Sequence, residues 1–285
     1  IHIEKKMFNY YYANKGVKDY DIIRLNSVIS ARSNASLNLL NDEVTVQGVR
    51  RFNFSDSQNV IAVPTEQTVV IKANRTLAFG GMIRAGRFDL FSKDFEFDYE
   101  NFATKPTTID SMRLYYPDED GKMRRVNSVL SNLYGVLEID KPNNKAGLKD
   151  FPEYPIFRSE RGSEVTYDKP STHNGVYKAD DFKFVVDPFE IDSLDNFTVE
   201  GLQFDGTFIS ADIFPDFKYK LSIQEDFSLG FKKASPPSGY AMYMGKGQGF
   251  MDINLSNEGL YGSGRIEYSG TTIESESFLL LPNKT

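Results

Sequence analysis

A glycine-rich run at residues 245–249 is the stretch of this sequence that most resembles a phosphate-binding loop. It reads Gly-Lys-Gly-Gln-Gly. A P-loop needs a longer frame that ends in Lys followed by Ser or Thr, because this Lys reaches the phosphates and the hydroxyl binds Mg²⁺. The run lacks both features and lies between two strand-like stretches, 240–244 and 250–255. The pattern therefore predicts a β-hairpin or a bulge here.

Two groups of carboxylates are the next candidates for chemistry. One group contains Asp187, Glu190, Asp192 and Asp195, and the other occupies residues 118–120. Carboxylate oxygens bind Ca²⁺, but neither group has the loop spacing with a distal Glu that such sites use. Glycosidases need two carboxylates across a cleft, and with 40 acidic residues the sequence nominates no pair. We interpret both groups as solvated loop charge.

Nucleophile and metal chemistry has little material in this chain. There is no Cys, which excludes disulfides, thiolate nucleophiles and Cys-ligated metals. The only histidines are His2 and His173, and His173 lies in a turn sequence without a partner motif. Ser263 lies between two glycines in a run too short for a nucleophile elbow. We therefore nominate no catalytic, cofactor-binding or metal-binding residue and expect a protein that is not an enzyme and has no cofactor.

The composition limits the possible partners. The net charge is -7 and the pI is about 5.1, so no basic excess is present to neutralise nucleic-acid phosphates. The longest apolar runs are short, as at residues 278–281, so no membrane-spanning helix is expected. Because the chain starts at Ile1 without a Met, we expect a fragment or a processed product.

The elements that would position any site are strands. In residues 60–102, apolar side chains recur at every second position, as at Val69 and Ile71 or at Phe95 and Phe97. This period places alternate side chains on opposite faces of a strand. The connections are too short for helical crossovers. The prediction is an all-β fold of many short strands with tight turns, an elongated β-sandwich, jellyroll or β-solenoid, with at most one or two short helices.

The remaining chain divides into regions of different character. Strands are expected over 35–116, with a hairpin turn at 117–121, and the i, i+3, i+4, i+7 spacing at 126–134 predicts a short helix. Residues 140–180 are rich in Pro and Tyr, which predicts an extended connection with one or two edge strands. The expected organisation is a first β-rich unit at 1–139, this connection at 140–180 and a second β-rich unit at 181–285. The aromatic residues at 8–12 are expected to be strand residues that pack a sheet or a neighbouring domain, and an exposed platform for stacking a sugar or a base is the alternative.

Several phrases resemble very large exported cell-envelope proteins of unknown function from Bacteroidota. They are VQGVRRFNFSDSQNVIAVP, FGGMIRAGRFDLFSKDFEFDYENF, NGVYKADDFKFVVDPFEIDSLDNF and NLSNEGLYGSGRIEY. The resemblance implies a periplasmic, outer-membrane-associated or extracellular location. The short-strand pattern is more faintly similar to the bridge proteins of lipopolysaccharide transport, whose β-jellyroll holds acyl chains.

Three functions remain open at this point. The first is a non-enzymatic structural or protein-interaction segment, whose partners are other envelope proteins or neighbouring domains of the same long chain. The second is a lipid-binding or lipid-bridging β-groove, lined by the many apolar side chains on one strand face. The third is a carbohydrate-binding module, which the Tyr content permits and the absence of Trp disfavours. Nucleic acid is not an expected partner.

Overall fold

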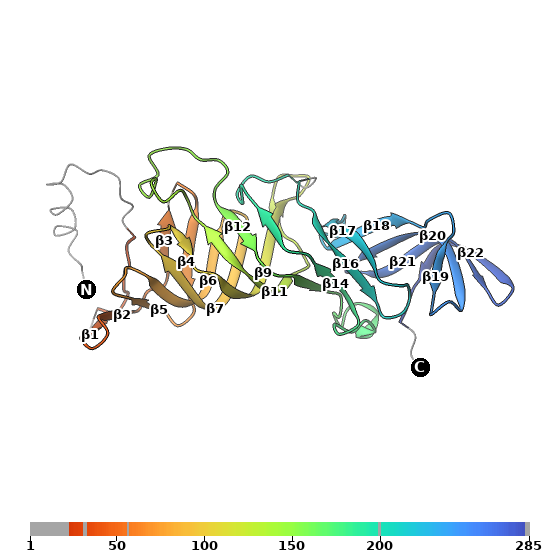
Figure 1. The fold of residues 1–285 in the computed structure, drawn as a ribbon, viewed down its shortest axis with the longest axis horizontal. Helices are drawn as coiled ribbons and strands as arrows, with labels where there is room; N and C mark the ends of the chain where they lie inside the picture. Colours follow the sequence, from red (N-terminus) through yellow and green to blue (C-terminus); the bar gives the residue numbers. More distant parts are fainter. Residues whose placement is uncertain (1–22, 31–32, 56, 199–200, 283–285) are drawn as a thin grey trace. The chain divides into compact units, whose positions relative to one another are not determined.

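The computed structural model describes residues 23–30, 33–55, 57–198 and 201–282 (Figure 1). These residues form 22 strands and one short 3-10 turn at His173–Gly175. The all-β prediction is confirmed. The strand pairs run antiparallel, which excludes a parallel solenoid in the described residues.

The fold consists of two compact units built from interleaved segments. Unit 1 contains residues up to Leu114 together with Asn132–Arg161 and Glu190–Phe197, and unit 2 contains Tyr115–Ser131, Gly162–Phe189 and the residues from Thr198 onward. The connection expected at 140–180 is thus divided, with 140–161 in unit 1 and 162–180 in unit 2.

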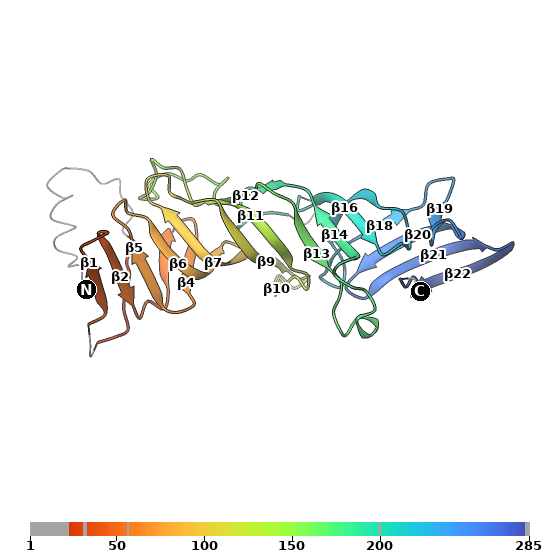
Figure 2. The ribbon, with the colours of Figure 1, turned by 60° about the horizontal axis from the view of Figure 1, so that its bottom comes forward.

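Unit 1 is a ladder of short strands that lie side by side (Figure 2). Its strands are β1 (Ala35–Asn38), β2 (Glu43–Gln47), β3 (Phe52–Ser55), β4 (Val60–Pro64), β5 (Thr68–Ile71), β6 (Leu77–Ala85), β7 (Phe88–Asp98), β8 (Ala103–Thr104) and β12 (Ile156–Ser159), with the larger parts of β9 (Thr107–Pro117), β11 (Leu130–Glu138) and β15 (Phe189–Ile191). The pairing order runs β1, β2, β5, β6, β7, β9, and β4 pairs with the second half of β6.

The interior of unit 1 is filled with phenylalanine rings. The ring centroids of Phe54 and Phe97 lie 4.4 Å apart, and Phe79 lies 5.4 Å from Phe52 and 5.5 Å from Phe95. All five side chains are buried. They come from alternate positions of β3, β6 and β7, which is the face that the sequence period selects.

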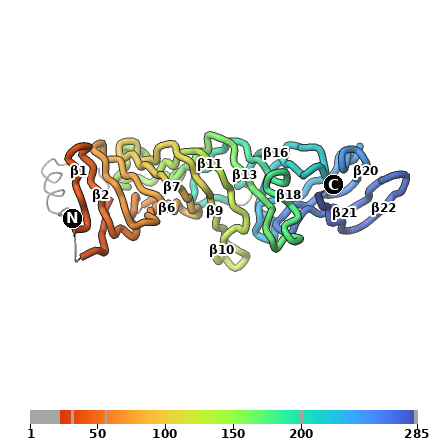
Figure 3. The backbone as a smooth tube through the Cα atoms, turned by 90° about the horizontal axis from the view of Figure 1, so that it is seen from below, coloured from red at the N-terminus to blue at the C-terminus, as the bar shows by residue number. Residues whose placement is uncertain are grey.

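Unit 2 is a second antiparallel ladder, whose last members form the long hairpin seen in Figure 3. Its strands are β10 (Met123–Arg125), β13 (Ser163–Thr166), β14 (Phe182–Val186), β16 (Phe204–Ser210), β17 (Phe217–Ile223), β18 (Leu229–Ala234), β19 (Tyr240–Met242), β20 (Gly247–Ser256), β21 (Gly259–Tyr268) and β22 (Thr271–Leu279). Buried rings fill this interior too, since Phe208 lies 5.4 Å from Phe182 and 5.2 Å from Phe231.

The helix predicted at 126–134 is wrong, because Leu130–Glu138 is strand β11. Leu130 and Leu133 are both buried although they are three residues apart. The backbone of Asn132 between them adopts a φ of 59°, which inserts an extra residue and shifts the alternation by one position. Beyond it the period of two resumes with Gly135 and Leu137 buried. A kink of this kind imitates helical spacing in a sequence.

The other local predictions have mixed outcomes. The hairpin at 117–121 is confirmed, since Met123 pairs with Pro117. The glycine-rich run at 245–249 is confirmed as a hairpin, in which Tyr240 pairs with Gly249. Two strands, β12 and β13, do lie within 140–180. Their expected position at a sheet edge is wrong, because β12 pairs with β11 and β15, and β13 pairs with β14 and β11. The aromatic residues at 8–12 lie outside the described residues.

Candidate functional site

A cleft of about 390 Å³ in unit 1, whose lining includes several polar side chains, is the candidate site. It lies where the turn after β7, strand β8, strand β11 and the loop that follows β11 come together. Its polar lining residues are Asp98, Asn101, Thr104, Lys105, Glu138, Asp140 and Tyr154. Three carboxylates, one ammonium group and one phenol are thus gathered at one place, which is the inventory from which acid–base chemistry is built.

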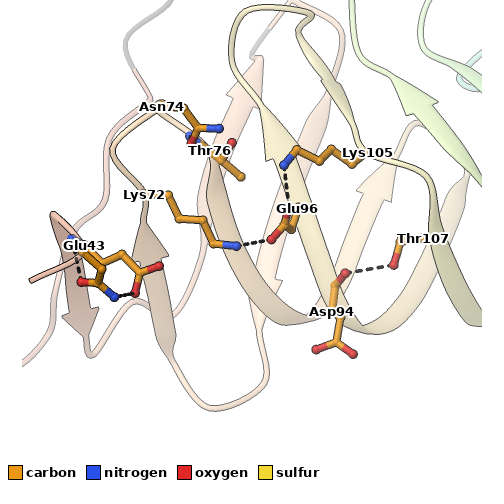
Figure 4. A network of polar contacts seen from close by, with 9 residues as sticks. Glu43, Lys72, Asn74, Thr76, Asp94, Glu96, Lys105 and Thr107 are labelled. Carbon is orange, nitrogen blue, oxygen red and sulfur yellow. Dashed lines mark hydrogen bonds and ion pairs between the residues drawn. The ribbon is translucent and has the colours of Figure 1, made fainter.

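Glu96 on β7 links Lys105, which lines the cleft directly after β8, to Lys72, which directly follows β5 (Figure 4). The alternation of β7 places this carboxylate on the face opposite to buried Phe95 and Phe97. Its Oε2 accepts a hydrogen bond from Lys105 Nζ at 2.7 Å, and its Oε1 accepts one from Lys72 Nζ. The hydrogen bond from Lys105, followed by that from Lys72, lowers the pKa of Glu96. Glu96 is therefore a charged brace between two lysines and is poorly suited to act as a general acid.

Asp98 is occupied by the turn that follows β7. Its Oδ1 accepts from the backbone N–H of Glu100 at 2.9 Å, and its Oδ2 accepts from Asn101 Nδ2 at 2.7 Å. These are the bonds of an Asx-type turn, in which a carboxylate replaces a backbone carbonyl as acceptor. The carboxylate therefore holds the rim of the cleft.

Asp140 is occupied by the loop that begins after β11. Asp140 is only 1% exposed. Its Oδ1 accepts from the backbone N–H of Lys141 at 2.6 Å, and its Oδ2 accepts from Asn144 Nδ2 at 2.8 Å. Asn144 Nδ2 also donates to the backbone carbonyl oxygen of Lys149, and Asn144 Oδ1 accepts from the backbone N–H of Lys149. A buried carboxylate needs such donors, and here they fix the loop over 140–149.

The third carboxylate and the phenol complete the lining. Glu138 forms an ion pair with Arg158, which also pairs with Glu190 at 2.6 Å. The hydrogen bond to Glu190 contributes most to raising the pKa of Arg158. Burial, followed by the charge of Glu138, raises the pKa of the Tyr154 phenol. A phenol that holds its proton more firmly than usual is not an activated nucleophile or base.

The carboxylates that line the cleft are not placed for proton transfer to a substrate. Each carboxylate of the cleft is an acceptor for local donors or a member of an ion pair. Within the part of the chain that the structure describes, no group of three or more His, Asp or Glu side chains is placed to hold a metal ion. The geometry favours a structural role for these polar groups.

The acidic residues weighed from the sequence do not form one site. Glu190 pairs with Arg158, whereas Asp187 lies 3.7 Å from Lys218 in unit 2. Asp118 accepts hydrogen bonds at the tip of the β9–β10 hairpin, and the backbone N–H of Lys122 is the main cause of its lowered pKa. These residues hold turns and strands as solvated or paired charges.

His173 has a partner that local sequence did not reveal. Its Nε2 lies 2.9 Å from the backbone carbonyl oxygen of Glu258 and 3.1 Å from the hydroxyl of Tyr261. Its ring also packs edge-on against Tyr177 and Tyr261. The histidine therefore attaches its loop to the β20–β21 turn within unit 2. No short motif encodes a contact between residues so far apart in the chain.

The cleft itself was not found from the sequence. Asp98 ends β7, and Asn101 lies in the turn that follows it. The signal available in the sequence was the run Asp-Tyr-Glu-Asn, because Asp and Asn are both turn-forming residues. Among the described residues, no helix has the length and apolar character needed to cross a membrane. No protein family, curated protein or solved structure was found to match this chain.

Proposed function

We propose that this chain is a non-enzymatic structural and protein-interaction segment of a large exported bacterial cell-envelope protein. The observation that carries the proposal is the use of the polar groups in the unit 1 cleft. Asp98, Glu138 and Asp140 are each committed to a turn, an ion pair or a loop. The envelope location is supported by the resemblance of the sequence phrases alone.

The filled interiors support a scaffold over a lipid carrier. A lipid groove needs apolar side chains that line an unfilled channel. In unit 1, Phe54 and Phe97 lie against each other and are at most 1% exposed, and in unit 2 Phe182 and Phe208 are fully buried. Each interior is occupied by its own rings, which leaves the outer faces and strand edges for partners.

Lipid analysis of the purified chain tests the first part of the proposal. The chain is purified without detergent, extracted with organic solvent and analysed by mass spectrometry against a protein of similar size as a blank. We expect lipid far below one molecule per chain. Phospholipid or lipopolysaccharide at about one molecule per chain would overturn the scaffold proposal.

Photocrosslinking in the host cell tests the interaction part. A photoreactive residue replaces one exposed side chain at a time, at Leu40, Leu148 or Met244, which are 97%, 65% and 70% exposed. We expect ultraviolet light to join the chain reproducibly to a protein from at least one of these positions. Absence of protein crosslinks at all three positions would contradict the proposal.

A further inference from the structure

The free edge of β22 at the end of unit 2 is a candidate surface for a partner strand. This strand has 9 residues, and its only strand partner among the described residues is β21. Among the described residues, no other element forms a backbone hydrogen bond with Thr271–Leu279. Beyond Ser275 a bulge shifts the register, and the Ser275 hydroxyl binds the backbone N–H and C=O of Ser277. The regular part of the edge, from Thr271 to Ser275, presents N–H and C=O groups to another chain.

The register shows which backbone groups point outward. A two-residue loop joins β21 to β22, and both of its residues have positive φ, 49° at Ser269 and 76° at Gly270, as in a type I′ turn. The closing pair of such a hairpin is hydrogen-bonded, and hydrogen-bonded and non-hydrogen-bonded pairs then alternate. Ile273 therefore bonds to β21, while the N–H and C=O groups of Thr272 and Glu274 face outward.

The side chains at this edge are divided by charge. On one face, Glu274 and Glu276 line an open groove of about 540 Å³, and neither forms an ion pair among the described residues. Arg265 lies in the same groove, but its carboxylate partner is Glu267 at 3.4 Å. On the other face, Ile273 lies opposite Ile266, and its side chain is 48% exposed. The edge is thus acidic on one side and carries the half-exposed Ile273 between Thr271 and Ser275 on the other.

The same charges disfavour those registers of a β22–β22 pair in which carboxylates meet. An antiparallel pair of β22 edges centred on Ser275 would place Glu274 directly opposite Glu276 of the other copy, and one centred on Glu274 would place the two Glu274 side chains opposite each other. Like charges directly opposite each other destabilise a strand pair. A strand with Lys or Arg on that face would instead neutralise both carboxylates.

We propose that the β22 edge accepts a β-strand from a protein partner that carries Lys or Arg on the Glu274 face and apolar side chains on the Ile273 face. The added strand takes its main-chain hydrogen bonds from the outward groups of Thr272 and Glu274, and its alternate side chains meet the two faces. This inference rests on the proposed interaction function and names the surface and the chemistry of the partner.

The probe is a fluorescein-labelled nine-residue peptide in which Lys alternates with Val or Thr. Fluorescence anisotropy with the full chain measures its binding at low and at high salt. We expect saturable binding that weakens as salt screens the carboxylates, together with slower hydrogen exchange at Thr272 and Glu274. Two peptides serve as controls, one with Glu in place of Lys and one with alternate backbone nitrogens methylated, and both are expected to bind at least tenfold more weakly. Equal binding of either control, or no binding of the Lys peptide, would overturn the proposal.

Two variants separate the edge from the charges. Thr272→Pro removes an outward N–H without removing a bond to β21, and proline is tolerated on such edges, so the chain should fold and the peptide should bind at least tenfold more weakly. Thr272→Val keeps the N–H and should bind as the parent chain does. Glu274→Gln combined with Glu276→Gln should weaken binding about threefold or more and remove most of its salt dependence. Unchanged binding by the proline variant would refute strand addition.

The alternative occupant and the parent proposal have separate readouts. Sedimentation of the chain alone is expected to show no dimer formed through the β22 edge. A dimer of the parent chain that Thr272→Pro abolishes would show that the edge binds a second copy instead of a basic partner. Crosslinking in the host from Leu40, Leu148 or Met244 tests the interaction function separately. If these crosslinks form but the peptide does not bind, the interaction function stands and the β22 edge is not its surface.

Discussion

At the scale of single residues, Glu96 should stabilise unit 1 in a pH-dependent way. Because the two lysines lower the pKa of Glu96 from its ordinary value of 4.5, its contribution is fully present above pH 4.5 and is lost as the pH falls through the lowered pKa. The three side chains are 31–42% exposed, so we expect Glu96→Gln to lower the free energy of unfolding at pH 7 by only about 0.5–1 kcal/mol. Urea unfolding at a series of pH values measures the difference. Glu66→Gln, which removes an exposed carboxylate in a turn, is the control. A deficit of Glu96→Gln that stayed constant into acid would contradict this account.

Tyr167 is a buried residue whose hydroxyl has one partner. The hydroxyl donates to the backbone carbonyl of Leu229 at 3.0 Å within unit 2, and the side chain is fully buried. Tyr167→Phe leaves that carbonyl without its donor, so we expect the free energy of unfolding to fall by about 1–3 kcal/mol. Tyr268→Phe, at a half-exposed position, should change it by less than about 0.5 kcal/mol. Loss of equal size in both variants would show that the buried bond is not the cause.

The same tyrosine should affect stability in alkali. Burial raises the pKa of Tyr167 above its ordinary value of 10.0. Its contribution to stability is therefore fully present below pH 10 and is lost as the pH rises toward the folded pKa, because only the unfolded chain then releases the proton. The parent chain should lose stability above pH 10 more steeply than Tyr167→Phe. Parallel curves of unfolding free energy for the two proteins would refute this.

At the scale of elements, the left-handed backbone of Asn132 in β11 lowers the free energy of unfolding by an amount that depends on the side chain at this position. Asn tolerates a φ of 59° better than a β-branched residue does. We expect Asn132→Val to destabilise the protein by about 1–2 kcal/mol, whereas Asn132→Gly should cost less. Thermal unfolding followed by circular dichroism measures both variants. A valine variant as stable as the glycine variant would show that β11 does not need this bend.

The positions of the strands could be predicted from the sequence better than the contacts between strands. The alternation at 77–97 depends only on which face is buried, so β6 and β7 could be inferred from the residues alone. The brace at Glu96 joins Lys72 and Lys105, and no local pattern says which strands will bring those lysines to one carboxylate. His173 and Tyr261 meet for the same reason. Local periodicity determines the face of a side chain, whereas the neighbours of a strand are set by the register of the whole ladder.

At the scale of the whole molecule, unit 1 depends on segments that follow the first parts of unit 2 in the chain. Arg87 N–H donates to the backbone carbonyl of Leu194 at 2.9 Å, and the ring of Phe197 lies 5.1 Å from that of fully buried Phe88. Strand β12 pairs with β11 through Ile156–Ser159. A fragment that ends at residue 139 lacks all of these segments, so its apolar face is left uncovered.

We therefore expect the fragment 1–139 to fail to fold by itself, although the sequence places a domain boundary after it. Uncovered apolar surface should make it bind an apolar dye such as anilinonaphthalene sulfonate and unfold without a cooperative transition in urea. Mixing it with the fragment 140–285 should reduce dye binding and restore cooperative unfolding, because the second fragment supplies β12 and Glu190–Phe197. The full chain is the reference for both measurements. Cooperative unfolding of 1–139 alone, with no dye binding, would instead establish it as an independent domain and show that the later segments are not needed to cover Phe88.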